Sequence, residues 1–297
     1  MRVKSLPRTN ERNYRLLVLP SIVIFVLLGL FPFIYTIVLS FYKYSESLGE
    51  KLFVGFGNYH DFFTDSLFWK VLANSLIFAT FTVAVEFLIG FASALLMNLG
   101  RRSKSFLRVI TLLPWGIPIV VAGLSFRFMY NDTFGVINGI LFSSHLLHYP
   151  IAWIGDTHYA LWALMFAEIW KSFPIIAFFL LAGLQVLPKE LYEAAEIDGA
   201  STIQSFFLVT LPLLKRVIWI ALMIRSMQAV AFPFEIVYSV TRGGPGDITQ
   251  LLVTLAYKYS FIFMELGKGA TLAILALLTE LMLGGVFFFF LLKRERA

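Results

Sequence analysis

Residues 188–205 have the sequence PKELYEAAEIDGASTIQS, a polar stretch between two long apolar runs. Pro188 and the acidic residues after it favour the start of a short helix, because proline fits the first helical position and carboxylates complement the helix dipole. Gly199 predicts the end of that helix, since glycine enters the left-handed conformation at little cost. Ser201 and Gln204 have the spacing of a capping box, which predicts that a second helix begins at once. We therefore expect two short helices folded around a glycine.

The composition of the whole chain indicates a membrane protein. Of its 297 residues, 59% are hydrophobic and only 14% are charged, whereas soluble domains carry roughly 25% charged residues. The mean hydropathy is +0.81. A soluble core of this size could not bury so much apolar surface, so lipid is the expected solvent. The absence of cysteine excludes disulfides, thiolate metal sites and a cysteine nucleophile.

Six apolar segments are long enough to cross a bilayer, which takes about 20 residues each. We place them at about 16–41, 71–99, 106–130, 160–187, 217–240 and 269–292. They predict an all-α polytopic membrane protein with one transmembrane domain over residues 16–292. Outside that domain we expect a basic tail at 1–15 and a second tail at 293–297, and within it a polar loop at 188–212.

The distribution of Lys and Arg predicts the orientation of these spans. The two tails and the basic cluster around Arg101 are expected on the same side as the 188–212 segment. The loops expected on the opposite side contain fewer Lys and Arg residues. Because cytoplasmic loops are enriched in Lys and Arg, both termini are expected in the cytoplasm. The net charge of +6 therefore reflects membrane edges and does not indicate nucleic-acid binding.

The run EAAEIDGAS at 193–201, followed by Leu211 and Pro212, resembles the EAA signature of permease subunits of bacterial and archaeal ABC importers. Three further stretches resemble the branch of sugar permeases that handles maltose, trehalose and glycerol-3-phosphate. They are FVGFGNY at 53–59, EIWK at 168–171 with AGLQ at 182–185, and TRGGP at 241–245 with Thr249. The resemblance extends over residues 16–294.

The resemblance implies an ABC importer type I permease fold in a prokaryotic cytoplasmic membrane, with the 188–212 loop as a coupling helix seated on an ATPase subunit. The residues implied in that contact are Glu193, Ala194, Ala195, Asp198, Gly199 and Ala200. The implied partners are a second permease chain, two ATP-binding subunits and an extracellular solute-binding protein. ATP and magnesium are expected in the ATPase subunits, because this chain has no phosphate-loop motif. We therefore expect neither enzymatic activity nor a cofactor in this chain.

The fifth apolar segment carries a candidate substrate path. Arg225, Gln228, Phe232 and Glu235 are spaced three, four and three residues apart, which predicts one stripe along a helix. Hydrogen-bonding groups beside aromatic faces suit a sugar, whose hydroxyls need partners and whose ring faces stack. The alternative is that these residues pack against the second permease chain or satisfy kinked backbone.

Other ionisable residues in the spans are also functional candidates, because charge is costly in a bilayer. Glu168 and Lys171 lie three residues apart, so they could pair on one helix face and contribute to the path. Glu86 and Glu280 are expected to make hydrogen bonds between helices. Trp153, in the long segment after the third span, is expected to be an interfacial anchor.

Together these features favour the membrane subunit of an ATP-driven importer that carries an oligo- or disaccharide or a related polyol. A secondary transporter driven by an ion gradient is the alternative, although such transporters commonly contain internal repeats and we find no convincing repeat here. A purely structural membrane protein fits the composition but not the EAA resemblance.

Overall fold

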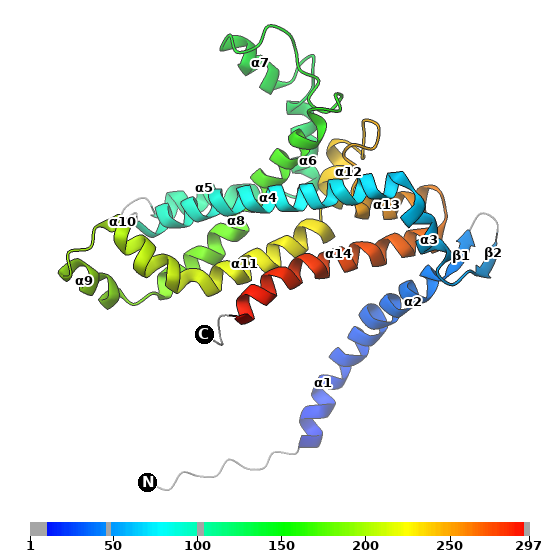
Figure 1. Ribbon diagram of the computed structural model, residues 1–297, viewed down its shortest axis with the longest axis horizontal. Coiled ribbons are helices and arrows are strands. Elements are labelled where there is room, and N and C mark those ends of the chain that lie inside the picture. Colours follow the sequence, from blue (N-terminus) through cyan, green and yellow to red (C-terminus); the bar gives the residue numbers. More distant parts are fainter. Residues whose placement is uncertain (1–10, 46–48, 100–103, 294–297) are drawn as a thin grey trace.

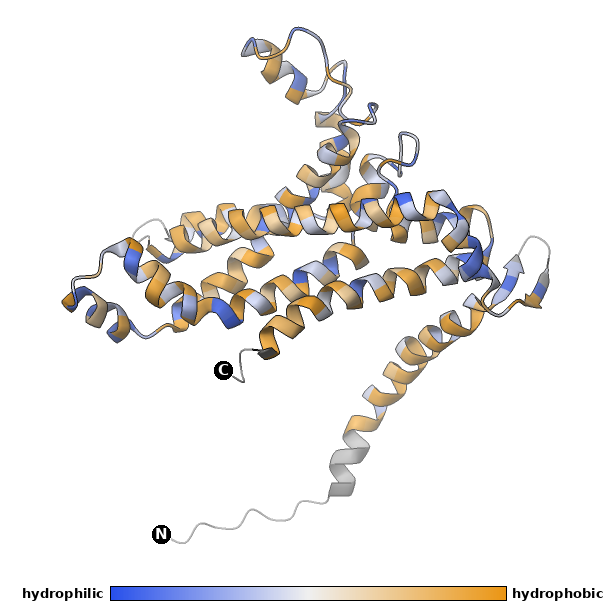
Figure 2. Ribbon diagram, in the orientation of Figure 1, coloured by the Kyte–Doolittle hydropathy of each residue, from blue (hydrophilic) through white to orange (hydrophobic). Residues whose placement is uncertain are grey.

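The computed structural model describes residues 11–45, 49–99 and 104–293. Four long helices, α4 (Ser66–Leu99), α8 (Ala160–Val186), α11 (Leu211–Ala231) and α14 (Leu266–Lys293), pack side by side as a bundle (Figure 1). By length and composition, five helical segments could cross a membrane, or six if one bent pair counts as a single span. Apolar residues cover the bundle along its length, and polar ones gather toward its two ends (Figure 2). This architecture confirms the all-α membrane fold.

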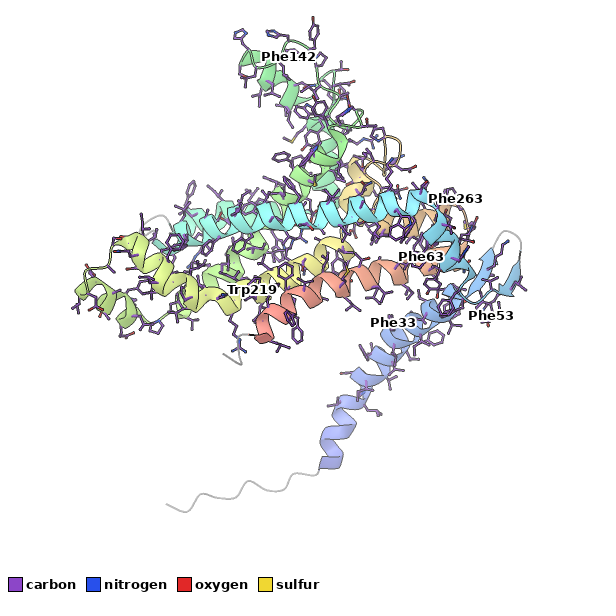
Figure 3. All side chains as sticks on the ribbon, in the orientation of Figure 1. Phe33, Phe53, Phe63, Phe142, Trp219 and Phe263 are labelled. Atoms are coloured by element: carbon purple, nitrogen blue, oxygen red, sulfur yellow. The ribbon has the colours of Figure 1, made fainter. Side chains whose placement is uncertain are left out.

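The first span contacts α14 through its second half, α2, whereas its first half, α1, stands apart from the bundle (Figure 1). It consists of α1 (Glu11–Phe25), a π-turn at Val26–Leu30 and α2 (Phe31–Ser40), and only 6% of its most apolar window is buried. Phe33 on α2 (Figure 3) is 45% exposed. The helix begins inside the predicted tail at 1–15, whereas residues 1–10 and 294–297 lie outside the described residues. Of the two predicted tails, only residues 11–15 and residue 293 belong to the described part of the chain.

A small outer unit follows the first span. Strands β1 (Tyr42–Ser45) and β2 (Glu50–Phe53) pair antiparallel, with Tyr42 opposite Phe53, and α3 (Gly57–Thr64) follows. The Nδ2 group of buried Asn58 donates to the backbone carbonyls of Ser40 and Tyr42, each at 2.9 Å. Asn58 therefore fastens α3 to the end of the first span, which gives the FVGFGNY stretch a structural role.

The segment predicted as the third span, at 106–130, is bent into two helices. Helix α5 (Lys104–Gly116) and helix α6 (Ile119–Met129) meet at 90°. Pro118 cannot donate a backbone hydrogen bond and disfavours helical geometry in the residue before it, and Gly116 is a weak helix former. The chain therefore turns sharply between the two helices, and α6 leads away from the bundle toward α7 (Val136–Ser143) (Figure 1).

The segment after α6 is organised around Asn138. The side-chain amide of Asn138 donates to the carbonyls of Asp132 and Ile151, and its oxygen accepts from the indole of Trp153 at 2.9 Å. Trp153 also packs beside Tyr130. Trp153 is thus part of an internal cluster, and the prediction of an interfacial anchor is not what the contacts favour.

The fifth span starts and ends earlier than the predicted 217–240. Helix α10 (Thr202–Ser205), a π-turn at Phe206–Thr210 and α11 form one helical segment over Thr202–Ala231. The π-turn precedes Pro212 and lets the helix pass a residue that lacks an amide hydrogen. Pro233 ends α11, because the residue before a proline avoids helical geometry. Residues 234–240 form a separate helix, α12 (Phe234–Val240), which packs against α6.

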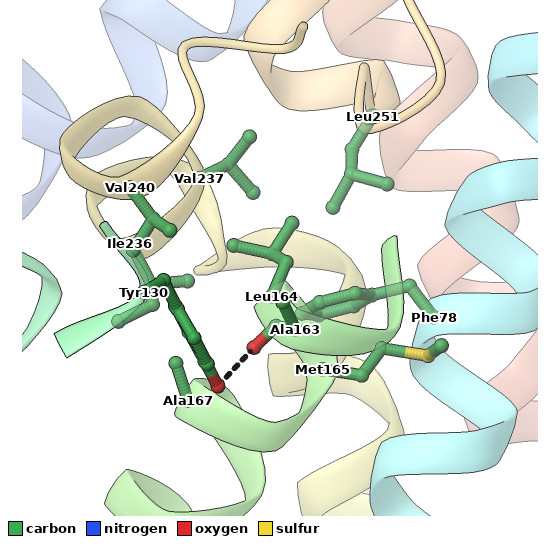
Figure 4. Close-up of a cluster of buried hydrophobic side chains, with 10 residues drawn as sticks. All are labelled: Phe78, Tyr130, Ala163, Leu164, Met165, Ala167, Ile236, Val237, Val240 and Leu251. Atoms are coloured by element: carbon green, nitrogen blue, oxygen red, sulfur yellow. Dashed lines mark hydrogen bonds between the residues drawn. The ribbon is translucent and has the colours of Figure 1, made fainter. Parts of the chain in front are cut away.

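Among the described residues, several buried clusters hold the bundle together, and two of them contain α8. In the first, residues from α4, α6, α8 and α12 surround Leu164, and the hydroxyl of Tyr130 donates to the carbonyl of Ala163 at 2.9 Å (Figure 4). The second joins the inner halves of α4, α8 and α11. A Cβ atom at Gly90 on α4 would lie 3.0 Å from Ile176 side-chain atoms and from the amide nitrogen of Ala177 on α8. The chain is completed by α13 (Leu252–Tyr257) and a π-turn at Lys258–Ile262.

Candidate functional site

The hairpin between α8 and α11 has the predicted form. Helix α9 (Lys189–Ile197) is followed by Gly199, whose φ is +80°, a left-handed conformation that favours glycine. Ser201 caps the next helix: its amide donates to Gln204 Oε1 at 2.8 Å and its hydroxyl accepts from the Gln204 amide at 3.3 Å. The predicted glycine turn and capping box are therefore confirmed.

A side-chain bond fixes the hairpin to the fifth span. The hydroxyl of Tyr192 on α9 lies 3.0 Å from the hydroxyl of Thr210, which belongs to the π-turn before α11. Since α8 runs directly into α9 and α10 runs directly into α11, the hairpin is continuous with two helices of the bundle (Figure 1). A force on α9 would act on both helices.

The two sides of α9 differ in their surroundings. Ile197 is 86% exposed and Leu191 is 42% exposed, and Ala194 beside them is also exposed. The opposite edge faces a cavity at the ends of the bundle helices, which Tyr192, Glu193 and Glu196 help to line. An exposed apolar strip on a short polar helix is a feature typical of a binding surface.

A second candidate site lies inside the bundle and is built from three charged side chains. The Nε group of Arg225 on α11 donates to Glu86 Oε2 on α4 at 2.6 Å, and its Nη2 group donates to Glu86 Oε1 at 2.9 Å. The same Nη2 group donates to Glu168 Oε1 on α8 at 2.5 Å. All three residues are buried. We call Glu86, Glu168 and Arg225 the charged triad.

The charged triad ties three spans together. A guanidinium fits a carboxylate with two parallel bonds, and such bonds are strong where water is excluded. Ser172 Oγ also donates to Glu168 Oε1, whereas Glu168 Oε2 is buried without a hydrogen-bond partner among the described residues. The expected interhelical bond of Glu86 is confirmed. Glu280, on α14, makes no such bond within the part of the chain that the structure describes.

Lys171 has a different partner from the one proposed from its spacing. Its ammonium group donates to the backbone carbonyl of Trp115 at 2.9 Å, in the last turn of α5. Glu168 is engaged by Arg225 and Ser172 instead. The local pair of Glu168 and Lys171 is therefore not formed, and Lys171 satisfies a carbonyl beside the break between α5 and α6. In the sequence, Gly116 and Pro118 are the residues that indicate this break.

The predicted stripe along the fifth span is divided. Arg225 is buried in the charged triad and Gln228 is half-buried on α11. Phe232 is 65% exposed in the break after α11, and the exposed Glu235 lies on α12. One continuous stripe is therefore wrong, because Pro233 interrupts the helix between its members. Arg225 and Glu168 are hydrogen-bonded to each other and buried. The candidates for substrate contact that remain accessible are Gln228, Phe232 and Glu235.

Comparison with known proteins places this arrangement in a family. Residues 86–295 match the model of the family described as binding-protein-dependent transport system inner membrane component. The chain is 35% identical over 273 residues to the trehalose/maltose transport system permease protein MalF of Thermococcus litoralis, covering 90% of this chain and 91% of that protein. It is 36% identical over 260 residues to the sulfoquinovosyl glycerol transport system permease protein SmoG of Agrobacterium fabrum, covering 87% and 83%.

Solved structures show the same fold. A chain of a bacterial ABC transporter involved in the import of the acidic polysaccharide alginate superposes with a TM-score of 0.79 at 20% identity, covering 93% of this chain and 96% of that chain. A chain of a bacterial alginate ABC transporter in complex with an alginate pentasaccharide-bound periplasmic protein gives a TM-score of 0.80, also at 20% identity, with 93% of both chains covered. The family match, the full-length relatives and the bundle with its inner hairpin agree, and this chain belongs to the family of inner membrane components of binding-protein-dependent transport systems.

Proposed function

We propose that this chain forms half of the translocation path of an ATP-driven importer for an oligo- or disaccharide or a related polyol. Relatives that match along most of the chain are named as permeases for trehalose, maltose and sulfoquinovosyl glycerol, which supports a sugar-like substrate. A second permease chain supplies the other half of the path, and an extracellular solute-binding protein delivers the substrate. In a prokaryotic cytoplasmic membrane, both termini lie in the cytoplasm and no nucleic acid is involved.

The observation that carries the proposal is the exposed apolar strip of α9 in a hairpin continuous with α8 and α11. A separate ATPase subunit, which binds ATP and magnesium, covers this strip. The contact uses Glu193, Ala194, Ala195, Asp198, Gly199 and Ala200. Closure of the ATPase subunits then moves the hairpin and changes which side of the membrane can reach the path, a rigid-body transition. The family and relatives are binding-protein-dependent or permease systems, so they lend no support to the ion-gradient alternative.

The substrate contacts are proposed on the surface that remains accessible. Gln228 and Glu235 supply hydrogen-bonding groups, and the exposed ring of Phe232 supplies a stacking face for a sugar ring. Arg225, Glu168 and Lys171 hold the helices that carry this surface. These three residues contribute to the path by positioning the surface that contacts the substrate.

Replacement of Gly199 by alanine tests the coupling role. Its φ of +80° costs an alanine about 1–2 kcal/mol, so the turn between α9 and α10 should change shape. We expect ATP-dependent uptake of maltose or trehalose into membrane vesicles to fall, together with the amount of ATPase subunit that co-purifies. Gly285→Ala is the matched control, because a Cβ there meets nothing within 4 Å. Unchanged uptake and unchanged co-purification in Gly199→Ala would contradict the proposal, as would uptake abolished by a protonophore while ATP remains.

A further inference from the structure

Two adjoining cavities lie where the hairpin meets the inner ends of α4 and α8. One has a volume of about 590 Å³ and the other about 720 Å³. They share four lining residues, Asn98, Leu99, Leu184 and Tyr192. A molecule could therefore occupy both at once.

The first cavity is apolar. Its further lining comes from Leu95 near the end of α4 and from the α10 region, including Ile203, Phe206 and Phe207. These residues belong to helices that enter the membrane, since the fifth apolar segment begins at Thr202. Thr202, Ser205 and Thr210 add hydroxyl groups, but most of the lining surface is apolar, so the cavity suits a hydrocarbon chain.

The second cavity is polar and carries both signs of charge. Arg108 on α5 and Lys189 on α9 supply positive charge, and Glu193 and Glu196 on α9 supply negative charge. The Nε group of Arg108 is buried, and no hydrogen-bond acceptor reaches it from the residues that the structure describes. Buried polar groups in proteins are nearly always hydrogen-bonded, so this N–H group is available to an acceptor that is not among the described residues.

The order of the two cavities follows the membrane. The apolar one lies beside the spans, and the polar one extends to α9 at the expected cytoplasmic end, where Arg101, Arg102 and Lys104 precede α5 in the sequence. Basic pockets between spans on the cytoplasmic side bind lipid headgroups. A purely anionic headgroup would meet Glu193 and Glu196, whereas a headgroup with a phosphate and an ammonium group complements all four charged residues.

We propose that these cavities form a binding site for one inner-leaflet phospholipid with a phosphoethanolamine headgroup. The phosphate accepts hydrogen bonds from Arg108 and Lys189, the primary ammonium donates to Glu196, and an acyl chain fills the apolar cavity. The lipid then fills the space between α9 and the ends of α4 and α8. This site does not depend on which substrate the chain carries.

Lipid retention tests the site directly. The chain, purified with its co-purifying subunits from membranes that contain phosphatidylethanolamine and phosphatidylglycerol, is washed in detergent and its bound lipid is quantified by native mass spectrometry. We expect about one phosphatidylethanolamine per chain. Arg108→Gln should lower its retention roughly tenfold, because a charge-assisted hydrogen bond is lost. Lys215→Gln is the control, since Lys215 lines a different cavity, near Trp219.

A second variant separates headgroup recognition from folding. Glu196 is exposed, so Glu196→Gln should leave the fold intact, yet it removes an acceptor for the ammonium and should shift retention toward phosphatidylglycerol. Three results would overturn the proposal: equal retention in Arg108→Gln and Lys215→Gln, no change of headgroup preference in Glu196→Gln, or no bound lipid when the ATPase subunits are present. All are measured without ATP or substrate, so failure here is distinct from failure of the coupling role.

Discussion

Arg225 and Glu86 are 139 residues apart in the chain and form a two-pronged ion pair, with N–O distances of 2.6 and 2.9 Å. Glu168 joins the pair from a third helix, so one guanidinium compensates carboxylates from α4 and α8. Removing a partner from a buried ion pair is costly because the remaining charge has no compensation. The charged triad is therefore a central determinant of how these three spans pack.

Replacement of Arg225 by methionine should destabilise the protein strongly. Two buried carboxylates would remain without a cation, a cost of about 3–5 kcal/mol. We expect the melting temperature of the detergent-solubilised protein to fall. The double variant Glu86→Gln with Arg225→Gln should melt above Arg225→Gln alone, because it removes one of the stranded charges. Equal melting temperatures for wild type and Arg225→Met would show that the pair does not stabilise the bundle.

Replacement of Lys171 by methionine should loosen the break between α5 and α6. The Trp115 carbonyl loses its donor, and because this bond is only partly buried the cost should lie near the low end of about 1–3 kcal/mol. The chain contains no cysteine, so spin labels can be placed at Leu113 and Leu124 alone. We expect the distance distribution between these labels to broaden. An unchanged distribution would mean that Pro118 sets the bend without Lys171.

Enlargement of Gly90 should separate α4 from α8. A Cβ atom there already lies 3.0 Å from Ile176 and Ala177, so a leucine must displace the α8 backbone. We expect a loss of about 1–3 kcal/mol of stability, measured as a lower melting temperature. Gly285→Leu provides the comparison at an open site on α14, and it should melt near wild type.

Loss of the Tyr192 hydroxyl should free the hairpin without unfolding the bundle. Tyr192→Phe removes one bond to Thr210, worth about 1 kcal/mol. Hydrogen exchange of the α9 amides should become faster, while the amides of α8 remain protected. Tyr149→Phe, at a tyrosine that is 81% exposed, should leave exchange in α9 unchanged. Slow exchange in Tyr192→Phe would contradict a tethering role.

The hairpin could be predicted because its signals are local. Gly199 and the pair Ser201 and Gln204 act over a few residues, and each has the conformation that its chemistry favours. The presence of long apolar helices followed in the same way from continuous apolar sequence, although the fifth starts and ends earlier than predicted. Pro118 and Pro233 are also local signals, but the sequence around each of them stays apolar. A prediction of spans from apolar length alone therefore treats as one helix two segments that the proline separates.

The partners of Arg225 could not be predicted from spacing. Glu86 and Glu168 lie 139 and 57 residues away, and their meeting depends on how α4, α8 and α11 pack. Helical periodicity places Lys171 near Glu168, yet the nearby Trp115 carbonyl and the competing guanidinium decide which bonds form. Spacing within one helix identifies possible neighbours and carries no information about groups supplied by other helices.

The position of the contact between Arg225 and Glu168 along α8 affects how far each end of this helix would move if it tilts. Glu168 lies eight residues from the end of this helix at Ala160 and eighteen from its end at Val186, beside the hairpin, which at the α-helical rise is about 12 Å and about 27 Å. For any tilt of α8 about this contact, the end beside the hairpin moves more than twice as far as the end at Ala160, and in the opposite direction.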